Sequence, residues 1–204
     1  TIPQQVLYEK LKSKKNQNIY ELIHEDSPCQ LYFDLDESSE EHLKLLLKLM
    51  KKALPDIEFA ISGHNEGKFS RHLVATNYHF SGSTHLKESG FRDYVKNCLQ
   101  PFINTKVNAT NNKKIMEVDS QVYRSRGLMK AIYQCKEDRK VKGKWVKYTK
   151  QTQLPITHIK NIKNHIITII NKDSKLITNE FKKYININPK INPQKLDKVK
   201  NKKS

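Results

Sequence analysis

One short segment, residues 31–36 (LYFDLD), constrains the fold of this chain more than any other. Apolar and polar side chains alternate along it, and a period of two is typical of a β-strand whose two faces differ. One face carries the apolar side chains Leu31, Phe33 and Leu35. Tyr32, Asp34 and Asp36 lie on the other face, so the segment predicts a sheet with two carboxylates on one surface.

Further strands are expected on both sides of this segment. Residues 18–36 hold two apolar-rich pieces around a polar turn, which predicts two strands. Residues 57–80 alternate in two runs around a turn that contains Gly67, and this pattern predicts a hairpin. Residues 115–123 predict a strand that ends near Asp119, where the apolar alternation breaks.

Two helices are expected among these strands. Ser38 and Glu41 have the spacing of a capping box, and apolar residues recur at helical spacing from there to residue 54. Residues 87–99 place apolar side chains on one helical face before Pro101. Strands interspersed with helices predict an α+β or α/β domain, and we expect it to be an α+β domain over residues 1–180.

The remaining segments have weaker patterns. Residues 104–114 predict a loop rich in Asn and Lys, and residues 136–150 predict a hairpin or a loop. The segment 154–170 has four isoleucines that it can bury: Ile159, Ile162, Ile166 and Ile170. Residues 181–204 are polar and lysine-rich, so a disordered tail or linker is expected there.

Positive charge is the main feature of the composition. The chain has 38 Lys and Arg against 21 Asp and Glu, a net charge of +17, which favours a polyanionic partner such as nucleic acid. Heavy use of Lys, Asn and Ile is also typical of A/T-biased codons, which is a second explanation for part of the excess. The three cysteines have the spacing of neither a zinc site nor a disulfide framework.

The apolar residues form no run of about eighteen and no secretory signal, which predicts a soluble, intracellular protein without a membrane partner. The chain starts at Thr1 and ends in a lysine-rich stretch with few core residues. We expect it to be a segment of a longer polypeptide.

Asp34 and Asp36 are the first candidates for chemistry. Two carboxylates at positions i and i+2 of a strand share a surface and can bind the same hard cations. Nucleotidyl transfer needs such carboxylates, because two metal ions about 4 Å apart activate the attacking hydroxyl and stabilise the leaving pyrophosphate. An isolated D-x-D pair is more often only a solvated strand end.

Lys68, Ser70 and His72 form a second set at two-residue spacing. In an extended strand they face the same way, and an ammonium, a hydroxyl and an imidazole can all donate to phosphate oxygens. His72 taken alone is more often a structural histidine than a ligand.

Asp119 is the third candidate, at an expected strand end. It could complete a metal site, or it could be a turn residue ahead of a solvated basic face. The basic residues that follow it are Arg124, Arg126, Lys130 and Lys136.

Taken in order, these three motifs resemble those of the archaeo-eukaryotic primase superfamily: hydrophobic-D-x-D, then S-x-H, then hydrophobic-D. The segments YELIHEDSPCQLYFDLD, KFSRHLV and VDSQVYRSRGLMKAIYQCK resemble in particular the PrimPol group and its relatives in large DNA viruses. The resemblance covers residues 18–136. Three matches in the correct order are more specific than any one of them.

The resemblance implies a fold, an activity and roles for named residues. It implies an N-terminal α/β lobe and an RRM-like lobe with the active site in the cleft between them. Asp34, Asp36 and Asp119 match the catalytic acids that bind Mg²⁺ or Mn²⁺. The positions that match nucleotide-binding residues are Lys68, Ser70, His72, Lys130 and Lys136.

The implied activity is template-dependent synthesis and extension of primers, with dNTPs or NTPs as substrates and single-stranded DNA as the template. A helicase or a single-strand-binding protein is a further partner that the resemblance suggests. The implied location is the nucleus or mitochondrion for a cellular source and a replication compartment for a viral one.

Three positions or features depart from the family pattern. PrimPol itself commonly has D-x-E where this chain has Asp36, and Lys130 stands where arginine is common. A zinc-binding module, which many relatives use for priming, is missing from this sequence.

The alternative function is a non-catalytic, RRM-like module that binds single-stranded nucleic acid. A repair polymerase fused to a ligase or helicase is a third possibility.

Overall fold

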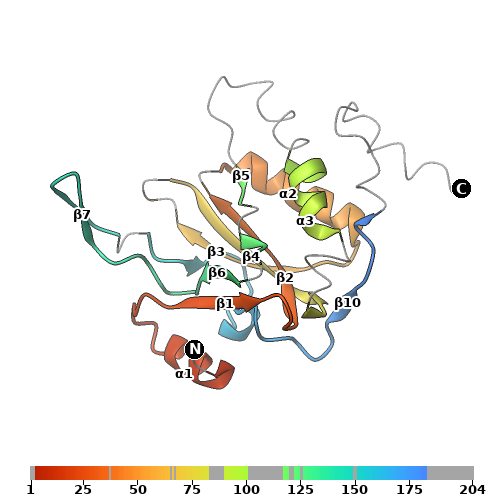
Figure 1. Ribbon diagram of the computed structural model, residues 1–204, viewed down its shortest axis with the longest axis horizontal. Helices are drawn as coiled ribbons and strands as arrows, with labels where there is room; N and C mark the ends of the chain where they lie inside the picture. Colours follow the sequence, from red (N-terminus) through yellow and green to blue (C-terminus); the bar gives the residue numbers. More distant parts are fainter. Residues whose placement is uncertain are drawn as a thin grey trace, which may run out of the picture.

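A six-stranded sheet built around two long strands organises the described part of the chain (Figure 1). The two are β2 (Cys29–Asp36) and β4 (Ser70–Phe80), which run antiparallel. The strand order is β5-β2-β4-β3-β9, and β10 pairs with β4 in parallel. The shorter strands are β3 (Phe59–His64), β5 (Glu117–Val118), β9 (Leu154–Pro155) and β10 (Lys175–Ile177).

This computed structural model describes residues 3–36, 38–64, 66, 68–82, 90–100, 117–119, 122–124, 126–148 and 151–182. Three α-helices accompany the antiparallel pairings, so the described part has the α+β character predicted from the sequence. The predicted hairpin is confirmed, because β3 and β4 pair antiparallel.

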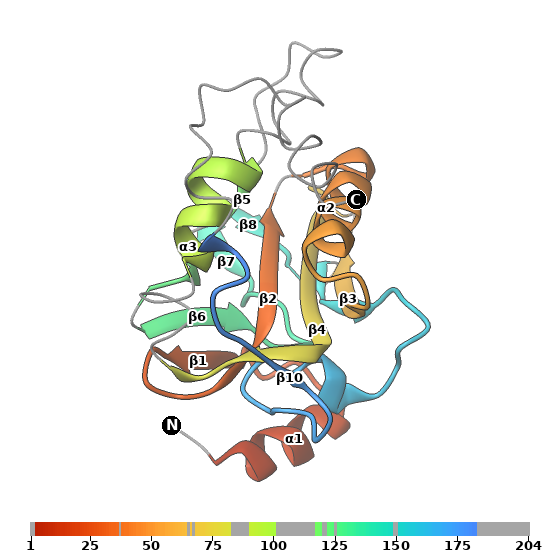
Figure 2. The ribbon, with the colours of Figure 1, turned by 90° about the vertical axis from the view of Figure 1, so that its right-hand side faces the viewer.

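A separate two-stranded sheet joins distant parts of the sequence. β1 (Tyr20–His24) pairs antiparallel with β6 (Arg126–Lys130), and Tyr20 lies opposite Lys130. The two strands predicted within residues 18–36 therefore exist as β1 and β2, but in different sheets. Figure 2 shows β1 and β6 running crosswise to β2 and β4.

Helix α2 (Glu40–Ala53) packs its apolar side against the main core. Its buried residues include Leu43, Leu46 and Met50, which belong to the same cluster as Phe33 of β2. The predicted start of this helix is wrong by one residue. Ser39, not Ser38, is the N-cap, and its side chain accepts a hydrogen bond from the backbone N–H of His42. The backbone N–H of Ser38 instead donates to Phe69 O.

Helix α3 (Phe91–Tyr94) continues into a π-helical turn, Val95–Leu99. Phe91 is fully buried at the centre of an aromatic cluster. Its ring centroid lies 4.9–5.5 Å from those of four aromatic side chains: Phe33, Phe80, Tyr123 and Phe181. The predicted helix over 87–99 is thus present from Phe91 onward, and 87–89 lie outside the described residues.

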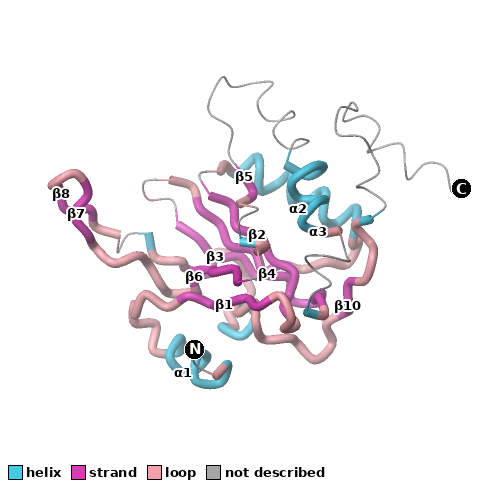
Figure 3. The backbone as a smooth tube through the Cα atoms, in the orientation of Figure 1, coloured by secondary structure: helices cyan, strands magenta, loops and turns pink. Residues whose placement is uncertain are grey.

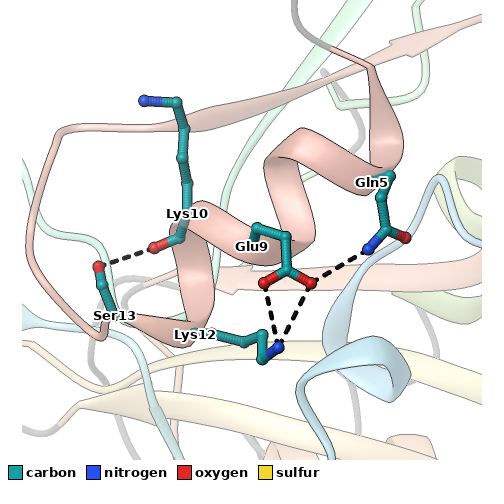
Figure 4. Close-up of polar contacts among 5 residues, drawn as sticks. All are labelled: Gln5, Glu9, Lys10, Lys12 and Ser13. Carbon is teal, nitrogen blue, oxygen red and sulfur yellow. Dashed lines mark hydrogen bonds and ion pairs between the residues drawn. The ribbon is translucent and has the colours of Figure 1, made fainter.

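A smaller core lies beneath helix α1 (Gln4–Lys12), where Leu7 and Leu11 pack near Ile166. On the exposed side of α1, the Glu9 carboxylate accepts a hydrogen bond from Gln5 and forms an ion pair with Lys12. The Lys10 side chain extends away from these three residues (Figure 4).

The 154–170 segment differs in part from its prediction. Ile166 is buried, together with the neighbouring Ile167, whereas three other isoleucines are only partly covered: Ile159, Ile162 and Ile170. The segment winds through the short 3-10 helix Ile162–His165, so the burial does not follow a regular period.

The basic stretch after Lys136 forms a hairpin of β7 (Arg139–Val141) and β8 (Lys144–Val146). In Figures 1 and 3 it extends away from the rest of the fold. The predicted loop at 104–114 lies outside the described residues, and so does the predicted tail 181–204 apart from Phe181 and Lys182. The predicted start of the tail is wrong, because Phe181 is fully buried in the main core against Phe91. Among the described helices, none has the length and apolar character needed to cross a membrane.

Candidate active site

The register between β2 and β4 brings two of the predicted motifs onto one face. Asp34 lies directly opposite His72, and the His72 Nε2 to Asp34 Oδ1 distance is 3.6 Å. Directly paired residues of antiparallel strands share a face, and so do residues two positions apart. Asp36 and Ser70 therefore join Asp34 and His72 on this surface.

An open cavity of about 140 Å³ lies over this surface. Seven of the eight predicted site residues line it: Asp34, Asp36, Lys68, Ser70, His72, Lys130 and Lys136. They come from β2, from β4 and the residues before it, and from β6 and the segment after it. The fold thus brings together segments about a hundred positions apart in the sequence.

Asp119, the eighth predicted residue, follows β5 at the edge of the sheet. Its backbone N–H donates to the carbonyl oxygen of Asp34 at 2.8 Å. Asp119 is not among the residues that line the cavity, but its charge acts on the carboxyl group of Asp34. The three predicted acids are therefore neighbours.

The acidic side of the cavity is crowded with like charge. Burial, together with the carboxylates of Asp36 and Asp119, raises the pKa of Asp34 to about 7. Lys68 and Lys136 act in the opposite direction. The Asp34 side chain is 19% exposed, so water screens this repulsion only weakly. A bound cation would relieve it.

Asp36 already has one cationic partner. Its carboxylate forms an ion pair with the ammonium group of Lys68, from the segment just before β4. The Asp36 side chain is 44% exposed, so this carboxylate stays accessible from solvent.

The basic side of the cavity is crowded with positive charge. Burial, together with the charge of Lys136, lowers the pKa of Lys130 to about 8. Lys130 Nζ donates to the Tyr20 hydroxyl at 2.8 Å and lies 4.1 Å from the centroid of the same ring. Neither partner neutralises the charge of Lys130, so this side of the cavity favours an anion.

His72 lies between the two sides and connects the two sheets. Burial lowers its pKa to about 4, so the ring is neutral at pH 7. The backbone of Lys130 on β6 opposes this shift, so His72 is near β6 as well as β2. A neutral imidazole has one N–H to donate, and the tautomer decides which nitrogen carries it.

Five residues that sequence reasoning missed also line the cavity: Tyr20, His64, Leu128, Gln151 and Gln153. Gln153 is only 3% exposed, and its Nε2 donates to Ser70 Oγ at 3.4 Å. Its Oε1, like Nδ1 of His64, has no hydrogen-bond partner among the described residues. No local pattern could have revealed Gln153, because it is 83 positions from Ser70 in the sequence.

The donors on the acidic side are hard carboxylate oxygens, which suit Mg²⁺ or Mn²⁺. Across the described ranges, no group of three acidic, histidine or cysteine side chains is placed to hold a metal ion together. An incomplete protein shell fits a magnesium site, since Mg²⁺ is usually held by one or two carboxylates together with substrate phosphates and water. The residues therefore fit a divalent cation shared with a phosphate ligand.

Comparison with models of known protein families finds no match, and comparison with curated proteins finds none either. The resemblance described above therefore remains a prediction.

Proposed function

We propose that this chain is the catalytic domain of a primase-polymerase, an enzyme that joins nucleotides on a single-stranded DNA template. One observation carries the proposal: a single cavity has paired carboxylates, Asp34 and Asp36, on one side and paired lysines, Lys130 and Lys136, on the other. A metal-bound triphosphate matches both sides, because the metal ion is positive and can meet the carboxylates, while the phosphates are negative and can meet the lysines. The superfamily resemblance suggests the template-dependent reaction.

Each side of the cavity would have its own task. Asp34, Asp36 and Asp119 would hold Mg²⁺ or Mn²⁺, which when bound activates the attacking hydroxyl and offsets charge on the leaving pyrophosphate. Lys130 and Lys136 would hold the phosphates of the incoming nucleotide. Ser70 and neutral His72 can each donate a hydrogen bond to an oxygen between these two sides.

The alternative function is a non-catalytic module that binds single-stranded nucleic acid. The charge of the chain suits both functions. The acidic side of the cavity argues against a pure binder, because carboxylates repel phosphates unless a cation lies between them. We therefore favour the enzyme. In this proposal the main sheet belongs to the α/β lobe, and the cavity lies in the cleft between that lobe and an RRM-like lobe.

Primer synthesis on a single-stranded template tests the proposal. The assay supplies dNTPs or NTPs with Mg²⁺ or Mn²⁺ and compares the wild-type chain with the double variant Asp34→Ala/Asp36→Ala. We expect product from the wild type and none from the variant, which should still fold and bind DNA. Asp26→Ala/Asp173→Ala is a matched control, because it removes two exposed acids outside the cavity. Activity in the cavity variant would refute the proposal.

A further inference from the structure

The β7–β8 hairpin is a ribbon of mostly exposed residues. All three residues of β7 are exposed, and so are the first two residues of β8. Trp145 is 67% exposed, and it is the only tryptophan in the chain. At this exposure the indole ring contributes little to the core and is accessible to a partner.

The turn of the ribbon has a defined shape. Val141 pairs with Lys144, which leaves a two-residue loop of Lys142 and Gly143. Both have positive φ, 50° and 79°, as a type I′ turn requires, and this turn matches the twist of paired strands. At the base, the backbone N–H of Tyr148 donates to Asp138 Oδ1 at 2.7 Å. The ribbon is therefore closed at both ends.

Two cations of the ribbon lie beside aromatic rings. Lys140 lies directly opposite Trp145, with its Nζ 5.6 Å from the indole centroid. The guanidinium of Arg139, on the other face, lies 5.9 Å from the ring of Tyr148. In each pair a cation lies beside an aromatic ring, and this combination binds unpaired bases and their phosphates.

The charge of the ribbon is strongly positive. Residues 136–148 contain six basic side chains and two acidic ones. The six are Lys136, Arg139, Lys140, Lys142, Lys144 and Lys147. This excess favours a polyanion over a neutral or basic partner.

The ribbon begins and ends at the cavity. Lys136 precedes it, Gln151 follows it, and both line the cavity. Lys140 is four residues beyond Lys136, so an extended chain places its Cα no more than about 14 Å from that of Lys136. Trp145 lies directly opposite Lys140. A strand of nucleic acid bound on the ribbon would therefore lead toward the cavity.

We propose that the β7–β8 ribbon binds single-stranded nucleic acid, with the Trp145 ring stacked on an unpaired base and the lysines around it in contact with phosphates. The partner is of the class that the proposed function uses as template. The binding itself needs neither metal nor catalysis, so it can be tested when the proposed activity is absent.

Intrinsic fluorescence tests the contact directly, because Trp145 is the only tryptophan. A (dT)20 oligonucleotide is titrated into the wild-type chain with EDTA and without nucleotide triphosphates. We expect saturable quenching that weakens as salt rises, and weaker quenching by a duplex of the same length. Absence of any fluorescence change at saturating oligonucleotide would overturn the proposal.

Variants separate stacking from charge, with anisotropy of a labelled (dT)20 as the measurement. We expect Trp145→Ala and Trp145→Leu to weaken binding about 5- to 100-fold, and Trp145→Phe to retain most of the affinity. The triple variant Lys140→Ala/Lys144→Ala/Lys147→Ala should reduce the slope of log K against log salt by about 2. Lys10→Ala on α1 is the control for an exposed lysine outside the ribbon (Figure 4).

Two results would overturn the inference. One is unchanged affinity in Trp145→Ala, measured on protein whose melting temperature equals that of the wild type. The other is equal quenching by poly-glutamate, which would assign the ribbon to acidic proteins. Asp34→Ala/Asp36→Ala should bind (dT)20 as the wild type does. A wild-type chain that binds (dT)20 through the ribbon but makes no primer would count against the proposed function alone.

Discussion

Asp34 and His72 face each other across β2 and β4, with 3.6 Å between Oδ1 and Nε2. This distance is too long for a hydrogen bond, and burial keeps His72 neutral at pH 7, so the imidazole does not offset the charge of Asp34. The carboxyl group is left beside two other acids. We regard this crowded carboxyl group as the centre of the candidate site.

The substitution Asp34→Asn tests that view through stability. It removes one of three crowded carboxylates, so we expect an unchanged or higher melting temperature in EDTA. Mn²⁺ should raise the melting temperature of the wild type and have little effect on the variant, because binding to the native state stabilises it. Thermal unfolding with and without Mn²⁺ measures both effects, and equal Mn²⁺ stabilisation in the two proteins would contradict the assignment.

The lysines predict a separate effect on nucleotide binding. Lys130→Ala and Lys136→Ala should each weaken binding of a nucleoside triphosphate about 10-fold or more, since each removes a charged hydrogen-bond donor. Tyr20→Phe is the matched control, because it keeps the ring beneath Lys130 and removes only the hydroxyl. Calorimetric titration gives the affinities, and unchanged values in both lysine variants would remove these residues from the site.

Glu21 predicts a pH dependence of stability away from the cavity. It is 2% exposed, and its carboxyl group accepts hydrogen bonds from the backbone N–H and the hydroxyl of Thr168 at 3.1 Å. Burial raises its pKa from 4.5 to about 7, against the effect of these hydrogen bonds. The folded state therefore holds the proton more tightly than the unfolded state does.

The sign of the effect follows from that difference. The contribution of Glu21 to stability is full below pH 4.5 and is lost as pH rises to about 7, by about 3 kcal/mol. Glu21→Gln stays neutral and should remove this loss. Urea unfolding at pH 5 and pH 8 measures it, with Glu137→Gln as a control at an exposed position. An identical pH dependence in the wild type and Glu21→Gln would show that the prediction is wrong.

The cap of α2 gives a prediction for the fold itself. Ser39→Ala should lower the free energy of unfolding by about 1 kcal/mol, because the His42 N–H loses its acceptor. Ser38→Ala should change the free energy of unfolding by only a few tenths of the effect of Ser39→Ala. Denaturant unfolding of the two variants decides which serine is the cap, and a larger loss in Ser38→Ala would contradict the structure.

Local patterns in the sequence predicted much of the surface that carries the site. Alternation along β2 places Asp34 and Asp36 on one face, and the spacing of Ser70 and His72 does the same on β4. These predictions succeed because the period of a strand is a local property of the backbone. The end of the strand near Asp119 was predictable for the same reason.

Long-range contacts could not be predicted in this way. The pairing of β1 with β6 brings Tyr20 to Lys130, 110 positions apart, and no periodicity encodes such a pairing. Gln153 reaches Ser70 from the residue just before the two-residue strand β9, which is too short to show a period in the sequence. The helix cap was misassigned because Ser38 and Ser39 are equally suitable residues, and only the position of the Ser38 backbone against Phe69 decides between them.

In our account, one cavity binds a divalent cation and a triphosphate together. The effect of the cation on the affinity for the triphosphate is the most direct measure of this joint binding. Calorimetric titration of a non-hydrolysable nucleoside triphosphate should show tighter binding with Mn²⁺ than without it in the wild type. We predict that Asp34→Asn/Asp36→Asn abolishes the Mn²⁺ effect but retains weak triphosphate binding through Lys130 and Lys136. Triphosphate affinity that is independent of Mn²⁺ in the wild type, or an undiminished Mn²⁺ effect in the variant, would contradict the account.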